Sequence, residues 1–505
     1  MTLLVWRSPM QPGRRGPNTA ARRLPASSRP WAVADGRPAA PLDLSRPGRY
    51  HVIGVGGPGM SALALVLAEM GHTVSGSDLR EVPVLDRLRS AGVEVHIGHN
   101  RHHVDGCDAV TYSTAIPERN IELVASREAG IVTLHRAGML ASICAMTRAV
   151  GVAGTHGKTT TSSMMMLVLA AAGLRPSFVI GGDVTDIGTG AQWTGSEWSV
   201  VEADESDFTH LQLPLAATIL TNVDVDHLEN YGSFDAIVAG FEQYLDQVDG
   251  PKVLCADDEV CRRLAAVRDV VTYGTAPDAD YRIVDAESSA GTWRFVVVRR
   301  GETLGEVHLP LRGMHNVRNA TAVVAMATEL GVPFGVIAQS LERFGGVARR
   351  LDFRGSHGGA TFVDDYGHIP NEIAAALDAL RSSGDGFSRV VAVFQPNRYR
   401  RMALLSPEYR DAFVAADVTV ITEIYPSGDA PIPGVTGKLV VNAILDAHPH
   451  QRVVWLPRRH DLVEFLAREV RSGDVCVSMG CGDVAGLPSE VLARRVELDA
   501  ERFAT

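Results

Sequence analysis

The segment that most constrains the fold is the glycine-rich run GTHGKTTT at residues 154–161. An apolar strand pattern at residues 149–153 precedes it, and a helix pattern follows. In such a loop, backbone N–H groups and the helix dipole bind phosphate oxygens, while Lys158 adds a positive charge and the Thr159 hydroxyl is a ligand for Mg²⁺. The loop is a variant of GxxxxGK[ST], because Val152 replaces the first glycine. A glycine turn with a chance Lys-Thr pair is the alternative, which the scarcity of lysine in this chain disfavours.

The same order of strand, glycine turn and helix begins at Tyr50, and an apolar strand at residues 389–394 opens a third block. At roughly 100–200 residues per domain, 505 residues predict about three domains. Strands that alternate with helices imply parallel sheets covered on both faces. We therefore expect an α/β fold of three tandem domains: a Rossmann-like domain at residues 49–147, a central P-loop ATPase-type domain with a parallel or mixed sheet at residues 148–346, and a second Rossmann-like domain at residues 347–505.

The first 48 residues have a different composition. Nine Arg and eight Pro occur among residues 1–49, with no alternation of apolar and polar positions, which is typical of a disordered tail. Prolines and arginines interrupt every apolar stretch, so no signal peptide is predicted. The segment is a dispensable tail, an over-extended start or a binding arm.

Composition excludes several classes of protein. With 46% hydrophobic and 21% charged residues, the chain can bury substantial cores, and a net charge of −11 argues against nucleic acid as the main partner. The longest apolar stretch, at residues 164–174, is well short of the ~20 residues that span a bilayer. Six cysteines without a CxxC pair indicate the reducing cytoplasm.

The first glycine turn reads GVGGPG at residues 54–59, between a strand and a helix, with Asp78 at the end of the next strand. Glycines there let the backbone approach a pyrophosphate, and an acid about 20 residues on accepts a hydrogen bond from ribose or base. The pattern indicates a nucleotide or sugar-nucleotide site, and NAD or FAD would be the default ligand if it stood alone. A tight turn that needs glycine for its geometry is the alternative.

Candidate metal ligands follow two strands of the central block. Glu202 ends an apolar strand at residues 198–201, where a carboxylate beside a phosphate loop is expected to hold Mg²⁺. Glu205 and Asp207 are expected in a solvated acidic loop instead. His227 follows the strand pattern at residues 217–222 and is either a second metal ligand, an orienting residue or a structural histidine.

The motifs in their order resemble those of the Mur ligases of peptidoglycan synthesis, over about residues 50–483. The resemblance rests on the combination of the glycine turn at 54–59, GTHGKTTT at 154–161, EADESD at 202–207, TNVDVDH at 221–227, GMHNVRN at 313–319, FGGVARR at 344–350, DDYGHIP at 364–370 and QPNRYRR at 395–401.

The resemblance implies a cytoplasmic ATP- and Mg²⁺-dependent ligase that acts on UDP-N-acetylmuramate. Members that add later amino acids typically carry a carbamylated lysine soon after the D-H pair, and no lysine occurs between His227 and Lys252. This absence disfavours those members and is compatible with an alanine-adding one, and the resemblance implies L-alanine as the acceptor, joined to the lactyl carboxylate through an acyl phosphate. A recycling ligase that attaches a whole tripeptide shares nearly all these motifs and remains an alternative, as do a non-catalytic nucleotide-binding protein and an NAD-dependent dehydrogenase.

The resemblance also implies roles for individual residues. Catalytic roles fall to Lys158, His227, His368 and Arg398, with His368 as a candidate base for the amine. Mg²⁺ would be held by Thr159, Glu202 and His227. ATP would be contacted by Gly154, Thr155, Gly157, Lys158, Thr159, Thr160, Asn316, Asn319, Arg349 and Asp365. The substrates would be contacted by Gly54, Gly56, Gly57, Gly59, Asp78, Ser113, Thr114, Tyr366, His368, Arg398 and Arg401.

Three positions depart from the family pattern. Asn397 stands where the family usually has histidine, Asp429 where it has glutamate, and Cys481 where it has alanine.

Because the sites fall on three domains, the ligands are expected to meet when the domains close, which would exclude water from the acyl phosphate. The protein is expected to be a monomer or a homodimer.

Overall fold

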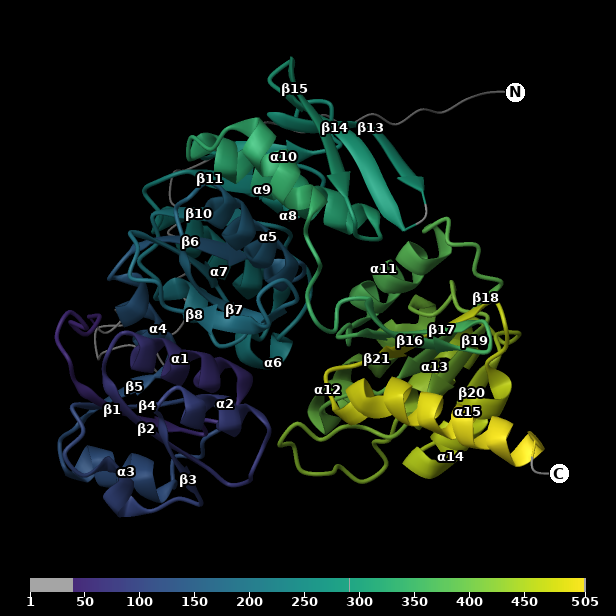
Figure 1. The fold of residues 1–505 in the computed structure, drawn as a ribbon, viewed down its shortest axis with the longest axis horizontal. Coiled ribbons are helices and arrows are strands. Elements are labelled where there is room, and N and C mark those ends of the chain that lie inside the picture. The colour runs from purple at the N-terminus through teal and green to yellow at the C-terminus, as the bar shows by residue number, and fades with distance from the viewer. Residues whose placement is uncertain (1–39, 290, 504–505) are drawn as a thin grey trace, which may run out of the picture.

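The computed structural model describes residues 40–289 and 291–503, which form three sheets with helices on both faces. In Figure 1 the first domain lies below the central one, and the C-terminal domain lies beside them. The expected α/β fold of three tandem domains is confirmed. The expected domain boundaries at 147/148 and 346/347 stay a prediction.

The first sheet is entirely parallel, in the order β3-β2-β1-β4-β5. This is the strand order of a Rossmann fold. Its strands are β1 (Arg49–Ile53), β2 (Thr73–Asp78), β3 (Glu94–Ile97), β4 (Ala109–Tyr112) and β5 (Val132–His135). Its helices are α1 (Pro58–Glu69), α2 (Val84–Ser90), η2 (Arg101–Val104), α3 (Ile121–Glu128) and α4 (Arg136–Cys144).

The central sheet has the order β15-β14-β13-β12-β11-β10-β6-β9-β7-β8. Its strands are β6 (Arg148–Ala153), β7 (Ser177–Val184), β8 (Thr189–Gln192), β9 (Trp198–Glu202), β10 (Ala217–Leu220), β11 (Lys252–Cys255), β12 (Val271–Gly274), β13 (Tyr281–Ser289), β14 (Thr292–Arg299) and β15 (Glu302–Leu309). Its helices are α5 (Lys158–Ala171), α6 (Leu228–Tyr231), α7 (Phe234–Asp246), α8 (Glu259–Ala265), α9 (Met314–Glu329) and α10 (Phe334–Glu342).

Both ends of the central sheet are antiparallel. β13, β14 and β15 form a meander at one end, and β8 pairs antiparallel with β7 at the other. The meander has one buried and one more open face, since buried and exposed side chains largely alternate along β13 and β14. The sheet is therefore mixed, one of the two expected forms.

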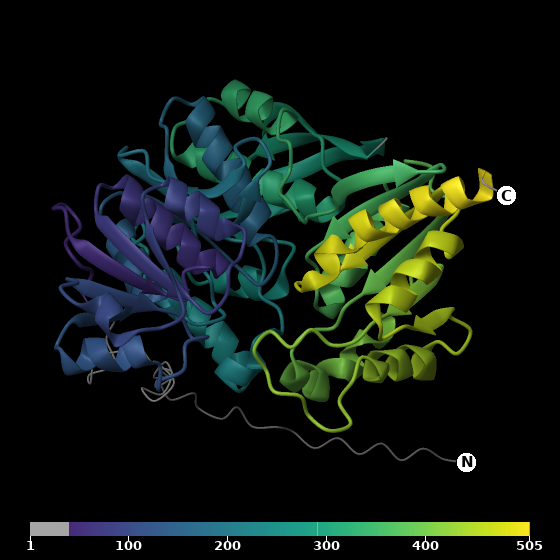
Figure 2. The ribbon, with the colours of Figure 1, turned by 60° about the horizontal axis from the view of Figure 1, so that its bottom comes forward.

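The third sheet has the order β16-β17-β21-β18-β19-β20, and its first strand alone runs antiparallel. Its strands are β16 (Asp352–His357), β17 (Ala360–Asp365), β18 (Arg389–Phe394), β19 (Val418–Ile421), β20 (Val453–Trp455) and β21 (Asp474–Met479). Its helices are α11 (Pro370–Arg381), α12 (Tyr399–Leu405), α13 (Lys438–Ala447), α14 (Arg459–Glu469) and α15 (Leu487–Phe503). Figure 2 shows α14 and α15 together on one face of this sheet.

One apolar core is continuous between the first two domains, from Leu44 to Val347, whereas the C-terminal domain has two separate cores of its own. The first two domains thus share buried apolar side chains. The contacts described below between the central and C-terminal domains are polar.

Residues 1–39 of the expected tail lie outside the described residues. The last part of the expected tail, residues 40–48, is described, and it packs against the first domain although the expected domain begins at residue 49. The Leu44 side chain is 3% exposed, and the Leu42 N–H donates to Ser142 Oγ at 2.9 Å. Across the described residues, every helix is too short or too polar to span a bilayer.

Candidate functional site

The loop after β6 is folded tightly against the end of β10. Gly154 has φ +126°, and a Cβ there would lie 2.2 Å from Thr221 Oγ1. The Thr155 N–H donates to the Asn222 carbonyl at 3.1 Å, and the His156 N–H to its Oδ1 at 2.9 Å. Gly157, at φ +82°, is the N-cap of α5 and offers no side-chain oxygen to the first N–H groups of the helix. Those N–H groups can therefore bind an anion.

Lys158 points back into this loop. Its Nζ donates to the Gly154 carbonyl at 2.6 Å and to the Glu205 carboxylate at 2.9 and 3.0 Å. Burial opposes its charge, but attraction to Glu205 and Asp204 outweighs burial and raises the Lys158 pKa. The ammonium is held in the charged form, paired with a carboxylate that a phosphate group would have to replace.

The acidic loop after β9 is not solvated as expected. Glu205 and Asp207 are only 3% and 7% exposed, so that prediction is wrong. Burial raises the pKa of Glu205, while Lys158 opposes the rise. Asp207 and Asp204 both bind Arg136 of α4, which joins the first and central domains. A run of acidic residues in a sequence is typical of a solvated loop. In this structure Asp204, Glu205 and Asp207 each have a cationic partner from another part of the chain.

Glu202 ends β9 beside the phosphate loop. Its Oε1 accepts from the Gly181 N–H at 2.8 Å, and the Thr159 hydroxyl is near enough to lower the pKa of the same carboxylate. Burial raises the Glu202 pKa, with Gly181, Lys158 and Thr159 opposing the rise. A half-buried carboxylate near a threonine hydroxyl at the start of a helix is a suitable site for a divalent cation.

His227 is held in a left-handed conformation at φ +54°, directly before α6. Its Nε2 lies 3.2 Å from Asp226 Oδ2. The charge of His227 also lowers the pKa of Glu205, after the larger effects of burial, Lys158 and Asp204. The structure thus brings His227 towards the same acidic group that holds Lys158.

The asparagines of α9 face the phosphate loop. Asn319 Oδ1 lies 2.7 Å from where a Cβ on Gly157 would be. Asn319 Nδ2 donates to Asn316 Oδ1 at 3.3 Å, and Asn316 Nδ2 donates to the Arg312 carbonyl at 2.8 Å. This chain of amides places Asn319 against the loop, with Asn316 one turn nearer the start of the helix.

The first glycine turn lies between β1 and α1. Gly54 has φ +75°, Gly57 is the N-cap of α1, and Pro58 and Gly59 open the helix. Asp78 Oδ2 accepts from the Gly56 N–H at 2.9 Å, so the acid braces the turn. Ser113 and Thr114 follow β4 at the same edge of the sheet, with Thr114 exposed.

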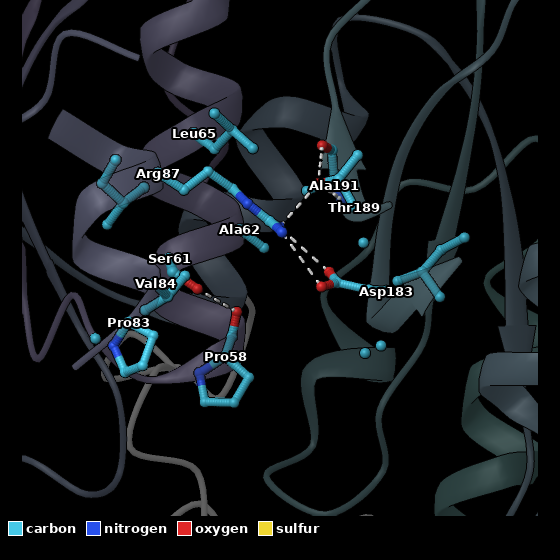
Figure 3. A pocket seen from close by; sticks show the side chains of 16 residues that line it. Pro58, Ser61, Ala62, Leu65, Pro83, Val84, Arg87, Asp183, Thr189 and Ala191 are labelled. Atoms are coloured by element: carbon cyan, nitrogen blue, oxygen red, sulfur yellow. Dashed lines mark hydrogen bonds and ion pairs between the residues drawn. The ribbon is translucent and has the colours of Figure 1, made fainter. Parts of the chain in front are cut away.

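A cleft of about 420 Å³ joins this turn to the central domain (Figure 3). Arg87 of α2 crosses it to bind Asp183 of β7 at 3.3 Å, and also donates to the Gly188 carbonyl at 3.0 Å. The cleft is lined by Gly56 and Pro58 on one side and by Gly181 and Gly182 on the other. Gly181 and Gly182 border Glu202 and Thr159. One ligand can therefore reach from the glycine turn to the candidate metal ligands.

The C-terminal domain contributes the loop after β17. Arg349 Nε donates to Asp364 Oδ2 at 2.9 Å, and its guanidinium lies 5.1 Å from the centre of the Tyr366 ring. Asp365 accepts from the N–H groups of Leu351 and Gly367, and burial raises its pKa to about 6. These contacts keep the loop in one conformation.

Glu372, on the first turn of α11, is a residue that the motif analysis missed. Its carboxylate lies 3.5 Å from His156 Nδ1 and 3.4 Å from His368 Nδ1, so it links the phosphate loop to the C-terminal domain. The only signal in the sequence is its place four residues after His368. Burial lowers the pKa of His368 to about 4 although Glu372 opposes the shift, so His368 is a neutral imidazole.

The two arginines expected to contact substrate have different surroundings. Arg401 is buried, with Nη2 3.1 Å from Asp226 Oδ1 and Nη1 3.4 Å from Asn397 Oδ1. Arg398 is the N-cap of α12 at φ +60°, and its N–H donates to the Tyr425 carbonyl at 2.9 Å. Asn397, which departs from the family pattern, thus supports Arg401 in this conformation.

Models of known protein families match nearly the same part of the chain as the motifs. The family models described as "Mur ligase family, catalytic domain", "Mur ligase middle domain" and "Mur ligase, glutamate ligase domain" match residues 49–148, 152–327 and 349–482. The UDP-N-acetylmuramate–L-alanine ligase of Bradyrhizobium sp. (strain BTAi1) is 42% identical over 461 residues, which cover 88% of this chain and 98% of the relative.

Two solved structures share the architecture. The UDP-N-acetylmuramate–alanine ligase MurC of Thermotoga maritima superposes with a TM-score of 0.76 at 27% identity, covering 89% of this chain and 99% of that one. A murein peptide ligase of Psychrobacter arcticus gives a TM-score of 0.64 at 23% identity, covering 88% and 98%. At that identity the second match is a likeness of fold alone.

Proposed function

The chain belongs to the Mur ligase family, and on that premise we propose that it joins L-alanine to the lactyl carboxylate of UDP-N-acetylmuramate, with ATP converted to ADP and phosphate. The relative that is 42% identical over 88% of this chain is named for this activity. The reaction would serve peptidoglycan precursor synthesis in the cytoplasm, and so cell-wall biogenesis, cell shape and cell division. All proposed site residues come from one chain, so a monomer suffices, and a homodimer is equally compatible.

The observation that carries this proposal is the cleft that runs from Gly56 to Gly181. A UDP-sugar needs a pyrophosphate site at one end and a position for its carboxylate near the ATP γ-phosphate at the other. The glycine turn and the N-terminus of α1 supply the first, and the neighbourhood of Thr159 and Glu202 supplies the second. A dehydrogenase would need no phosphate loop at the far end.

The residues present fit Mg²⁺ at the ATP site. Glu202 is half-buried, and among the contacts described Gly181 alone donates a hydrogen bond to it, so a cation would neutralise a charge that burial disfavours. We propose that Thr159, Glu202 and His227 hold it. Bound there, Mg²⁺ would polarise phosphoryl oxygens and offset the charge that develops during transfer.

Lys158 and the start of α5 would position the phosphates. When ATP binds, the γ-phosphate takes the place of Glu205 beside Nζ, so the ammonium exchanges one anion for another without leaving its carbonyl partners. The lactyl carboxylate oxygen attacks the γ-phosphorus in line, the bond to the β–γ bridging oxygen breaks, and ADP leaves. Asn316 and Asn319 would lie towards the adenine.

The C-terminal domain would deliver the amine. The amine nitrogen attacks the acyl carbon, the bond to the phosphate oxygen breaks, and phosphate departs with the former carboxylate oxygen. His368 would accept the proton that the amine loses, and Glu372, 3.4 Å from its Nδ1, would balance the positive charge that the imidazole gains. Arg398 would contact the reacting anions, whereas Arg401 would first have to exchange Asp226 for substrate. Tyr366, Arg349 and Asp365 would form the wall of this site.

Isotope transfer tests the proposed chemistry. UDP-N-acetylmuramate labelled with ¹⁸O in its carboxylate should transfer one label to inorganic phosphate for each amide formed, because that oxygen leaves with the phosphate. Mass spectrometry of phosphate and nucleotide gives the readout. Label in AMP would indicate acyl-adenylate chemistry and refute the proposal, as would unlabelled phosphate.

A further inference from the structure

A second cluster of metal-ligating side chains lies in the first domain, apart from the phosphate loop. It contains His51 on β1, His103 on η2 and Glu122 on the first turn of α3. Because side chains alternate along a strand, His51 shares a face with Ile53, which packs with Val104 and Leu123. The cluster is thus enclosed between the sheet, η2 and α3.

The ligand atoms converge on one point. The nearest imidazole and carboxylate atoms of the three residues all lie within 4.8 Å of one another. His103 Nδ1 is 2.6 Å from Glu122 Oε1, and His51 Nε2 is 3.7 Å from Glu122 Oε2. In a tetrahedral site with bonds of about 2.0–2.2 Å, two ligand atoms lie about 3.3–3.6 Å apart. The three side chains reach that geometry with small rotations.

The orientation of the His51 ring also suits a ligand. Its Nδ1 is 2.9 Å from Ser75 Oγ, which fixes the ring and directs Nε2 towards Glu122. Within the described residues that Nε2 makes no hydrogen bond, although the His51 side chain is fully buried. Metal-bound histidines characteristically hold their other nitrogen in this way. His96 stacks on His103 at 3.9 Å between ring centres and restricts that second ring.

We propose that His51, His103 and Glu122 bind a divalent transition-metal ion of the Zn²⁺ class, separate from the Mg²⁺ of the ligase reaction. Two imidazoles and one carboxylate favour Zn²⁺ over Mg²⁺ or Ca²⁺, which prefer oxygen ligands. His99 and Ser77, which bond to Glu122 Oε2 at 2.8 and 2.6 Å, are its outer partners.

The ion would tie together parts of the domain that carry the proposed uridine-diphosphate site. β1 leads directly into the glycine turn, and the chain before η2 bonds to the end of β2, where the Gly98 N–H donates to the Asp78 carbonyl at 2.7 Å. A metal that joins β1, η2 and α3 would therefore stiffen this edge of the sheet.

The test is metal titration of the whole chain. After EDTA treatment, the protein is titrated with Co²⁺ in excess Mg²⁺, and the intense visible absorption of tetrahedral Co²⁺ is followed. We expect one such ion per chain. His103→Asn, at a side chain 18% exposed, should weaken its binding by at least about a hundredfold, whereas His102→Asn, at an exposed neighbour, should leave it unchanged. Zn²⁺ should raise the Tm of the wild type and of His102→Asn only.

Three results would overturn the proposal. The first is a wild-type chain that binds no tetrahedral Co²⁺, which needs no variant to fold. The second is unchanged binding in His103→Asn, with folding checked by circular dichroism. The third is loss of the Co²⁺ spectrum in Glu202→Gln, since the ion would then belong to the ATP site.

Discussion

At the scale of single residues, the site is held together by charges that the reaction would redirect. Lys158 is paired with Glu205, and His156 with Asp224 and Glu372. Each pair is buried or half-buried, where removing one partner leaves an uncompensated charge. The same residues that would bind phosphate therefore also stabilise the protein before phosphate arrives.

Replacing Lys158 tests this double role. Lys158→Gln should lower the rate of phosphate release by about a hundredfold to a thousandfold, because one preorganised charge at the phosphates is lost. Lys252→Gln, at the start of β11, is the matched control and should retain the wild-type rate. The double variant Lys158→Gln/Glu205→Gln removes the unpaired carboxylate. If it recovers activity together with stability, Lys158 has no role in catalysis.

His156 predicts a dependence of stability on pH. Burial disfavours its charge, but the pairs with Asp224 and Glu372 outweigh burial and raise its pKa to about 9 from the ordinary 6.5. A raised pKa stabilises the folded state fully below pH 6.5, and this stabilisation is lost as pH rises through about 9. The urea midpoint should fall across that interval.

His156→Gln should flatten that part of the pH profile, and His308→Gln, on the exposed face of β15, should preserve it. Circular dichroism at several pH values gives the midpoints. A wild-type midpoint that is constant from pH 6.5 to pH 9, or rises, would contradict the assignment.

At the scale of elements, the sequence located most site-bearing strands because apolar runs ending in glycine or acid are local signals. The strand patterns at 149–153 and 198–201, which are followed by Gly154 and Glu202, fall within β6 and β9. The meander of β13 to β15 was not located, since its strands are half-exposed and lack such endings. The prediction that Glu205 is solvated is wrong, and Glu372 is not predicted at all. In both cases a cationic partner, Lys158 or His156, comes from a distant part of the chain.

Two glycines with positive φ, one in the phosphate loop and one after α5, are expected to differ in their effect on ATP binding when replaced by alanine. Gly154→Ala places a Cβ against Thr221 and the Asn222 backbone, which should cost about 1–3 kcal/mol of unfolding free energy and abolish ATP binding. Gly173→Ala, after α5, has φ +81° with open space around it, and should cost about 1–2 kcal/mol without affecting ATP. Calorimetric titration with ATP measures the difference. Equal ATP affinity in the two variants would show that the loop tolerates displacement.

At the scale of the whole molecule, the first two domains share one core, whereas the C-terminal domain meets the central one through polar contacts. Asp224 binds Asn371, and Asp226 binds Arg401 at 3.1 Å. Polar contacts of this kind exchange with water more readily than a buried apolar core. The C-terminal domain is therefore the one we expect to move.

Domain closure should be visible as compaction. UDP-N-acetylmuramate together with a non-hydrolysable ATP analogue should reduce the radius of gyration in small-angle X-ray scattering, because both ligands lie where domains meet. UDP alone, which reaches only the first domain, is the control and should have little effect. An unchanged radius with both ligands would count against closure.

The central claim is tested most directly by ATP-dependent phosphate release with L-alanine, glycine, L-serine and the murein tripeptide as acceptors. The account predicts release that requires UDP-N-acetylmuramate, Mg²⁺ and an acceptor, with L-alanine preferred. Preference for the tripeptide would make the protein a recycling ligase, and no release with any acceptor would leave a nucleotide-binding fold without the proposed reaction.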